Sequence, residues 1–185
     1  MSADDALRSA RDLQDQSRTA LIPAPPRTPN DVRANIQALL IGAVDEGALT
    51  SPIHEILGLL KHSVVRKPTG TYASLLCGES MDKGQAPGSF LHKPDGSRLS
   101  FFVMVVFDGH APGVLAAYRF HLQFPDRSVP PFLRFDLNHE SAEHEPLHEP
   151  RYHIHPGSNE IRAQIPPMTP AQVLHKLIYG VTAQA

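Results

Sequence analysis

The chain has 185 residues, a net charge of −2 at pH 7 and 41% hydrophobic residues. This length fits one domain plus an extension, and the hydrophobic share is enough for a core. Near-neutral charge and only 6% aromatic residues argue against broad phosphate-backbone binding or base stacking as the main role. A small basic pocket remains compatible with this composition.

Three features of the sequence predict where the protein is located. The first five residues carry two acids and no apolar stretch, so we expect no secretory signal. The single cysteine, Cys77, cannot form an internal disulfide and fits a reducing compartment as a buried core residue. The longest apolar run, Leu99 to Phe107, is too short to cross a bilayer. We therefore expect a cytoplasmic protein without a membrane partner.

The first 27 residues are predicted to form an arm that precedes the domain. Ser2 can cap a short amphipathic helix, and the proline-rich stretch from Ile22 to Pro29 breaks any helix. Two interpretations stay open: a frayed terminus, or a tether that binds a partner. The expected organisation is thus an arm over residues 1–27 and a single domain over residues 28–185.

Two helices are predicted at the start of this domain. Thr28 is a suitable N-cap and Pro29 suits the first helical position of a helix that ends near Gly47. Ser51-Pro52 repeats the signal for a second helix, which should end at about His62. Together they form a helical hairpin whose apolar side needs a partner surface.

From Tyr72 onward the apolar pattern has a period of two, which is typical of strands. Strands are predicted over Tyr72–Cys77, Ser89–Lys93, Arg98–Phe107, Val114–Phe124, Phe132–Asn138, Arg151–His155 and Glu160–Ile165. Short turns such as Pro94-Asp95-Gly96 favour antiparallel pairing, and Thr169-Pro170 starts a last helix. We expect an α+β fold: a mainly antiparallel sheet of five to seven strands, on which the helical hairpin and a C-terminal helix pack.

Alternation along three of these strands predicts a polar face. Alternate residues of a strand share one side of the sheet. If the three strands are neighbours, one face gathers Arg119, His121, Arg134, Asp136, His153 and His155.

This set suits acid–base chemistry on a phosphate group. Histidine and aspartate side chains can move protons near neutral pH, and arginine can clamp a phosphate. The predicted catalytic residues are His153, His155, Asp136 and His121. The predicted phosphate-binding residues are Arg119 and Arg134.

Two other interpretations of the face remain open. A divalent metal could bind His153 and His155, with Asp136 or His148 as a further ligand, although we expect no cofactor. The simplest alternative is that the residues are polar because one face of the sheet is solvated. The segment from Asn138 to Pro150, rich in His and Glu, is expected to be a solvated loop or a mobile flap over this face.

The motifs on these strands resemble those of the TumE-type toxins of bacterial toxin–antitoxin modules. The match joins Tyr118-Arg119, Arg134-Phe135-Asp136-x-Asn138, His153-x-His155 and a short apolar C-terminal helix, over about 114–178. Leu137 between Asp136 and Asn138, and the long loop before His153, depart from the family pattern. The resemblance implies a growth-inhibiting protein neutralised by a protein partner, with Arg119, Asp136, His153 and His155 as candidate active residues.

The same region is also similar to ubiquitin-conjugating domains. Phe120 to Pro125, Pro130-Pro131 and His155-Pro156-Gly157 follow their signature segments. No cysteine follows His155, so this resemblance implies a binding module without transfer chemistry. Because both resemblances use the same residues, at most one of them holds.

The leading hypothesis is therefore a toxin-like bacterial protein that acts on RNA or a nucleotide and is controlled by a protein partner such as an antitoxin. The alternative is a non-enzymatic, partner-binding subunit of a larger complex. The sequence leaves open whether the protein is an enzyme.

Overall fold

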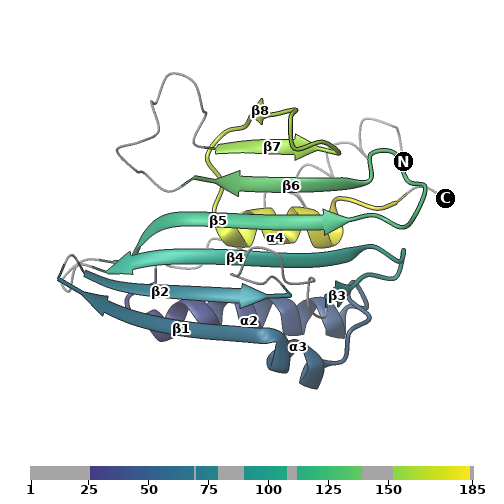
Figure 1. Ribbon diagram of the computed structural model, residues 1–185. Helices are drawn as coiled ribbons and strands as arrows, with labels where there is room; N and C mark the ends of the chain where they lie inside the picture. The colour runs from purple at the N-terminus through teal and green to yellow at the C-terminus, as the bar shows by residue number, and fades with distance from the viewer. Residues whose placement is uncertain (1–25, 69, 79–89, 108–111, 139–151, 184–185) are drawn as a thin grey trace, which may run out of the picture.

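A computed structural model of the chain describes residues 26–68, 70–78, 90–107, 112–138 and 152–183 (Figure 1). The helices are α2 (Pro29–Asp45), α3 (Ile53–Leu59) and α4 (Pro170–Tyr179). The strands are β1 (Leu60–Lys67), β2 (Gly70–Cys77), β3 (Leu91–His92), β4 (Arg98–Phe107), β5 (Val114–Gln123), β6 (Phe132–Leu137), β7 (Tyr152–Pro156) and β8 (Ala163–Gln164). The predicted N-terminal arm up to residue 25 and the histidine-rich segment over 139–151 lie outside the described residues.

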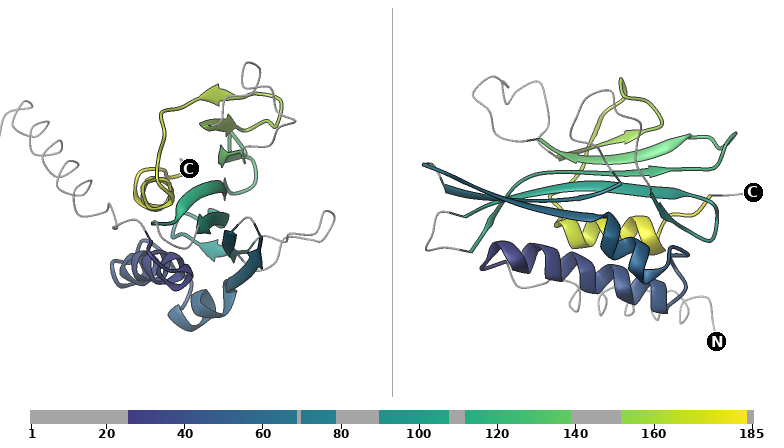
Figure 2. Two further views of the ribbon diagram at one scale, coloured as in Figure 1. Left: turned by 90° about the vertical axis from the view of Figure 1, so that its left-hand side faces the viewer. Right: turned by 60° about the horizontal axis from the view of Figure 1, so that its bottom comes forward.

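All eight strands belong to one sheet, in which each described pairing between strands is antiparallel. The order is β1-β2-β4-β5-β6-β7-β8, and β3 pairs with β4 beyond the end of β2. Helices α2 and α4 lie side by side on one face of this sheet (Figure 2). The predicted α+β class with a mainly antiparallel sheet is confirmed, with one strand more than expected.

Both strong helix-start signals of the sequence form caps. The backbone N–H of Thr28 donates to the Asp31 carboxylate at 2.8 Å, which fixes the first turn of α2. At the start of α4, Thr169 N–H donates to the Gln172 side chain, and Gln172 N–H donates back to the Thr169 hydroxyl. Reciprocal bonds of this kind satisfy N–H groups that a helix leaves unpaired at its N-terminus.

The predicted end of the second helix at His62 is wrong. Helix α3 ends at Leu59, and β1 begins at the next residue and pairs with β2 along its whole length. The β-branched pair Val64-Val65 favours a strand here, and the ladder to β2 outweighs the helical pattern before it. The strands expected at Ser89–Lys93 and Glu160–Ile165 are also shorter, as β3 and β8 have two residues each.

The core lies between the sheet and the two long helices. Leu40 of α2 and Leu177 of α4 are fully buried against Phe101 and Phe120, whose rings stack at 5.4 Å. Cys77 is buried here as expected, and burial raises the pKa of its thiol to about 12. None of the described helices is long and apolar enough to cross a membrane.

A buried lysine joins the end of α4 to the β3–β4 hairpin. The Nζ of Lys93 donates to the carbonyl of Leu177 at 2.8 Å and to the carbonyl of Val181. Asp95 lies 4.0 Å from the same Nζ and accepts the backbone N–H of Ala183. Burial lowers the pKa of Lys93, and the nearby Asp95 carboxylate partly opposes this effect.

Candidate functional site

The sheet face opposite α2 and α4, which we call the outer face, carries all six residues predicted for the site. Tyr118, Phe120 and Leu122 of β5 point into the core, so Arg119 and His121 point to the outer face. The pairing register then sets two rows across β5, β6 and β7. One row is Arg119–Asp136–His153 and the other is His121–Arg134–His155.

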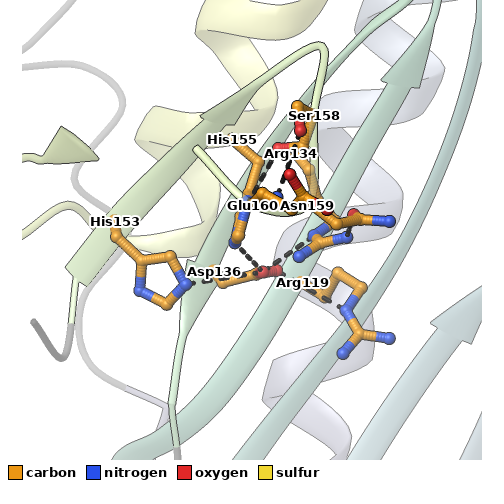
Figure 3. Close-up of polar contacts among 8 residues, drawn as sticks. All are labelled: Arg119, Arg134, Asp136, His153, His155, Ser158, Asn159 and Glu160. Atoms are coloured by element: carbon orange, nitrogen blue, oxygen red, sulfur yellow. Dashed lines mark hydrogen bonds and ion pairs between the residues drawn. The ribbon is translucent and has the colours of Figure 1, made fainter. Parts of the chain in front are cut away.

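Asp136 is the centre of the polar contacts on this face (Figure 3). Its Oδ2 accepts a hydrogen bond from Arg134 Nε at 2.8 Å, and its Oδ1 lies 3.5 Å from Arg119 Nε. The Nε2 atoms of His155 and His153 lie 3.4 Å and 3.7 Å from Oδ2. Two arginines and two histidines from three strands therefore converge on one carboxylate.

We call Asp136, His153 and His155 the Asp136 cluster. These three residues are buried, with 5%, 2% and 1% of their surfaces exposed. A sheet face exposed to solvent does not account for this burial, because polar residues whose only role is to face water stay accessible. Burial of a carboxylate is costly unless cations or donors compensate it, and Arg134 supplies the most direct compensation.

The orientation of His155 is set by a loop that follows β7. The Nδ1 of His155 lies 3.3 Å from the carbonyl oxygen of Ser158. A carbonyl only accepts, so Nδ1 carries the proton in this hydrogen bond. Burial, followed by the nearby Arg134 charge, lowers the pKa of His155. In the neutral ring, the lone pair of Nε2 then points towards Asp136 Oδ2.

The same loop also holds Arg134. Gly157 turns the chain with φ +78°, and a Cβ there would lie 2.7 Å from Pro130 Cβ. Two residues later, Asn159 Oδ1 accepts a hydrogen bond from Arg134 Nη1. The sequence reasoning missed Ser158 and Asn159, although Pro156-Gly157 directly after the strand is a turn signal.

His121 lies beside Arg134 and differs from the other two histidines. Burial and the neighbouring Arg134 charge lower the pKa of His121 to about 4, so the ring is neutral at pH 7. Its Nε2 is buried with no hydrogen-bond partner among the described residues, and its ring meets the edge of Phe132 at 5.1 Å. A base with such a low pKa takes up a proton poorly near neutral pH.

The Asp136 cluster also has the composition of a metal site. Each residue offers one ligand atom, and these three atoms lie within 4.8 Å of one another. Two imidazole nitrogens and a carboxylate oxygen are a donor set used for zinc and other first-row transition metals. His148, expected from the sequence as a further ligand, lies outside the described residues.

Apolar side chains continue the row of Arg119 on its other side. Phe102 of β4 lies directly opposite Arg119, and Leu76 of β2 lies opposite Phe102. Both side chains are half-buried on the outer face. The Arg119 side chain, with 55% of its surface exposed, therefore stands between the buried cluster and an apolar strip.

Together, the fold and the site define an α+β protein with an antiparallel meander that buries a carboxylate and two histidines, beside a partly buried arginine, on the face away from its helices. A scan against protein-family models finds no match, and searches of the curated proteins and of the solved structures also return none.

Proposed function

We propose that this protein binds a phosphate group of RNA or a nucleotide at Arg119 and hydrolyses a phosphate ester bond with the Asp136 cluster. One observation carries the proposal: a buried carboxylate contacts two histidines and a partly buried arginine, and also pairs with an exposed arginine. Titratable groups of both charges gathered at one point on a sheet face are candidates for a reactive site.

Arg119 is the residue best placed to hold the phosphate. Its guanidinium is 55% exposed and its ion pair with Asp136 is loose, at 3.5 Å. The planar guanidinium can therefore turn two N–H groups towards phosphate oxygens. Arg134 is 20% exposed and is already bonded to Asp136 and Asn159, so we assign it the role of positioning the carboxylate.

The apolar strip next to Arg119 fits the base of a nucleotide. Neighbouring strands are spaced by about 5 Å, so Phe102 and Leu76 stand roughly 5 and 10 Å from the Arg119 backbone. An aromatic ring at this distance from a bound phosphate can stack on any of the nucleobases. The substrate class that we propose is therefore a phosphate ester with an attached nucleobase.

The reaction itself consumes one water molecule. The water oxygen bonds to phosphorus, the ester oxygen leaves, one proton of the water goes to a group of the Asp136 cluster, and a proton returns to the leaving oxygen. His121, neutral because its pKa is about 4, serves in this account as a hydrogen-bonding group beside the substrate.

The resemblance to TumE-type toxins adds that the activity would inhibit growth until a protein partner neutralises it. Induced expression in a bacterial host tests this. We expect growth arrest with the natural chain and normal growth with His153→Ala plus His155→Ala. His92→Gln, at the exposed residue of β3, is the matched control and should still arrest growth. Equal arrest by the double variant at equal protein level would contradict the proposal.

The second candidate function is that of a non-enzymatic subunit, and the edge strand β1 favours it. Within the described chain β1 pairs only with β2, and Val64 and Val65 on it are exposed. A partner can add a strand to such an edge. Under this hypothesis, Val65→Pro should abolish co-purification of a stoichiometric partner, whereas the histidine variants should retain it.

A further inference from the structure

We propose that Asp136, His153 and His155 bind one divalent transition-metal ion, with zinc as the preferred ion. The inference deepens the proposed function, because the ion would be what activates the water. Only that catalytic role rests on the proposed function, since binding of the ion is a property of the three side chains and is measured separately.

The separations of the ligand atoms fit a shared ion. Zinc lies about 2.0–2.2 Å from nitrogen and oxygen ligands, which places tetrahedral ligand atoms roughly 3.3–3.6 Å apart. Asp136 Oδ2 is 3.4 Å from His155 Nε2 and 3.7 Å from His153 Nε2. The first distance lies within this range and the second is just above it, while all three ligand atoms lie within 4.8 Å of one another. Both distances are long for hydrogen bonds.

Donor and acceptor chemistry at His155 points in the same direction. The hydrogen bond to the Ser158 carbonyl places the proton on Nδ1, so Nε2 presents a lone pair to the Asp136 carboxylate. Nε2 is therefore the ring nitrogen that would coordinate an ion shared with Asp136 Oδ2.

The residues around the cluster hold the ligands as the outer shell of a metal site does. Metal-binding histidines commonly donate their second ring N–H to a backbone carbonyl, as His155 does to Ser158. The ligand carboxylate is in turn hydrogen-bonded by Arg134, which is fixed by Asn159. Both features orient ligands before an ion binds, and neither is needed for a solvated polar face.

The donor set also indicates which ion binds and what it does. Imidazole nitrogen favours zinc and similar metals over magnesium or calcium, which prefer all-oxygen sites. Three protein ligands leave a fourth tetrahedral position for water or substrate, as in catalytic zinc sites. Zinc lowers the pKa of bound water towards neutrality. The exposed guanidinium of Arg119, which pairs with the other carboxylate oxygen, can hold the phosphate beside that position.

Metal binding is tested on the full chain, produced without a histidine tag and dialysed with equimolar zinc. We expect about one zinc per chain by elemental analysis, and a visible absorption band when cobalt replaces zinc. Zinc should also raise the melting temperature of the natural chain relative to the chelator-treated protein, because an ion that binds only the folded state stabilises it. Absence of bound zinc and of a cobalt band would overturn the inference.

Variants locate the ion. Asp136→Asn and His155→Gln should each lower zinc affinity by more than about 100-fold, the upper end of the range for outer residues. His92→Gln removes an exposed histidine of β3 and should leave the affinity unchanged. If either cluster variant fails to fold, as judged by circular dichroism, the stoichiometry and cobalt band of the natural chain still decide. Unchanged zinc affinity in a folded cluster variant would overturn the assignment.

The measurements separate this inference from the proposed function. Stoichiometric zinc without hydrolysis of RNA or nucleotides supports the metal site and contradicts the proposed function. Hydrolysis by a protein that binds no zinc or cobalt overturns the metal site and leaves the proposed function standing.

Discussion

The Asp136 Oδ2 lies 3.4 Å from the His155 Nε2, although the two residues are not opposite each other in the sheet. The register pairs Asp136 with His153 and places His155 opposite Arg134, so the close contact is diagonal. Diagonal neighbours on one face meet only when both side chains are long enough and lean together. A shift of β7 by one residue would move both histidines to the core face and abolish the cluster.

Arg134→Gln is expected to weaken zinc binding by about 10–100-fold, because Arg134 orients the ligand carboxylate without touching the ion. The dissociation constant can be measured by competition with a coloured chelator. Arg66→Gln on the exposed part of β1 is the matched control and should bind zinc as the natural chain does. Equal affinities for all three proteins would contradict the positioning role of Arg134.

Gly157→Ala should disturb the loop that orients His155. The residue has φ +78°, and its new Cβ would meet Pro130 at 2.7 Å, so we expect a loss of about 1–2 kcal/mol in unfolding free energy. Zinc affinity should fall as well, because Ser158 follows directly. Gly58→Ala in α3, where nothing lies within 4 Å, is the control and should not destabilise the protein. An unchanged affinity in folded Gly157→Ala would show that the loop does not position His155.

Lys93→Met should destabilise the protein by about 2–4 kcal/mol, because two buried carbonyls at the end of α4 lose their donor. Methionine keeps most of the side-chain volume, so the loss reflects the polar contacts. Urea unfolding measures the difference, with Lys61→Met on the exposed face of β1 as control. A loss no larger than that of the control would mean that Lys93 does not hold the C-terminal helix.

Protonation of His121 should make the free energy of unfolding depend on pH. Its pKa is lowered from 6.5 to about 4, so the unfolded chain binds a proton between these values more readily than the folded chain. This contribution is fully present above pH 6.5 and is lost as the pH falls towards 4, amounting to about 3 kcal/mol. Unfolding of the natural chain and of His121→Gln should therefore differ in slope across this window, and parallel curves would contradict the assignment.

Local signals in the sequence predicted much of the fold. The strand over Arg98–Phe107 has its predicted bounds, and Thr28 and Thr169 start helices as expected. These signals depend on a few residues that are neighbours in the sequence, so tertiary contacts do not change the elements that they predict. Strand β1 was missed because its helical start signal lies just upstream, and only pairing with β2 decides where the helix ends.

The site was predictable in part for a similar reason. Alternation along β5, β6 and β7 placed six polar residues on one face, on the condition that these strands are neighbours, and the pairings β5–β6 and β6–β7 meet that condition. The burial of Asp136, its diagonal contact with His155 and the hydrogen bond from Arg134 to Asn159 depend on how separate segments of the chain pack together. Contacts of this kind arise from tertiary structure and have no periodic signal in the sequence.

The most direct test of the central claim is the rate at which labelled RNA of mixed sequence, or a nucleoside monophosphate, is hydrolysed by the natural chain and by Asp136→Asn. The variant keeps the shape of the side chain but removes the charge on which the two histidines and two arginines converge. We expect hydrolysis by the natural chain and a loss of at least about 100-fold in the variant, with the fold unchanged by circular dichroism. Equal rates for the two proteins, or no hydrolysis of either substrate by the natural chain, would contradict the account.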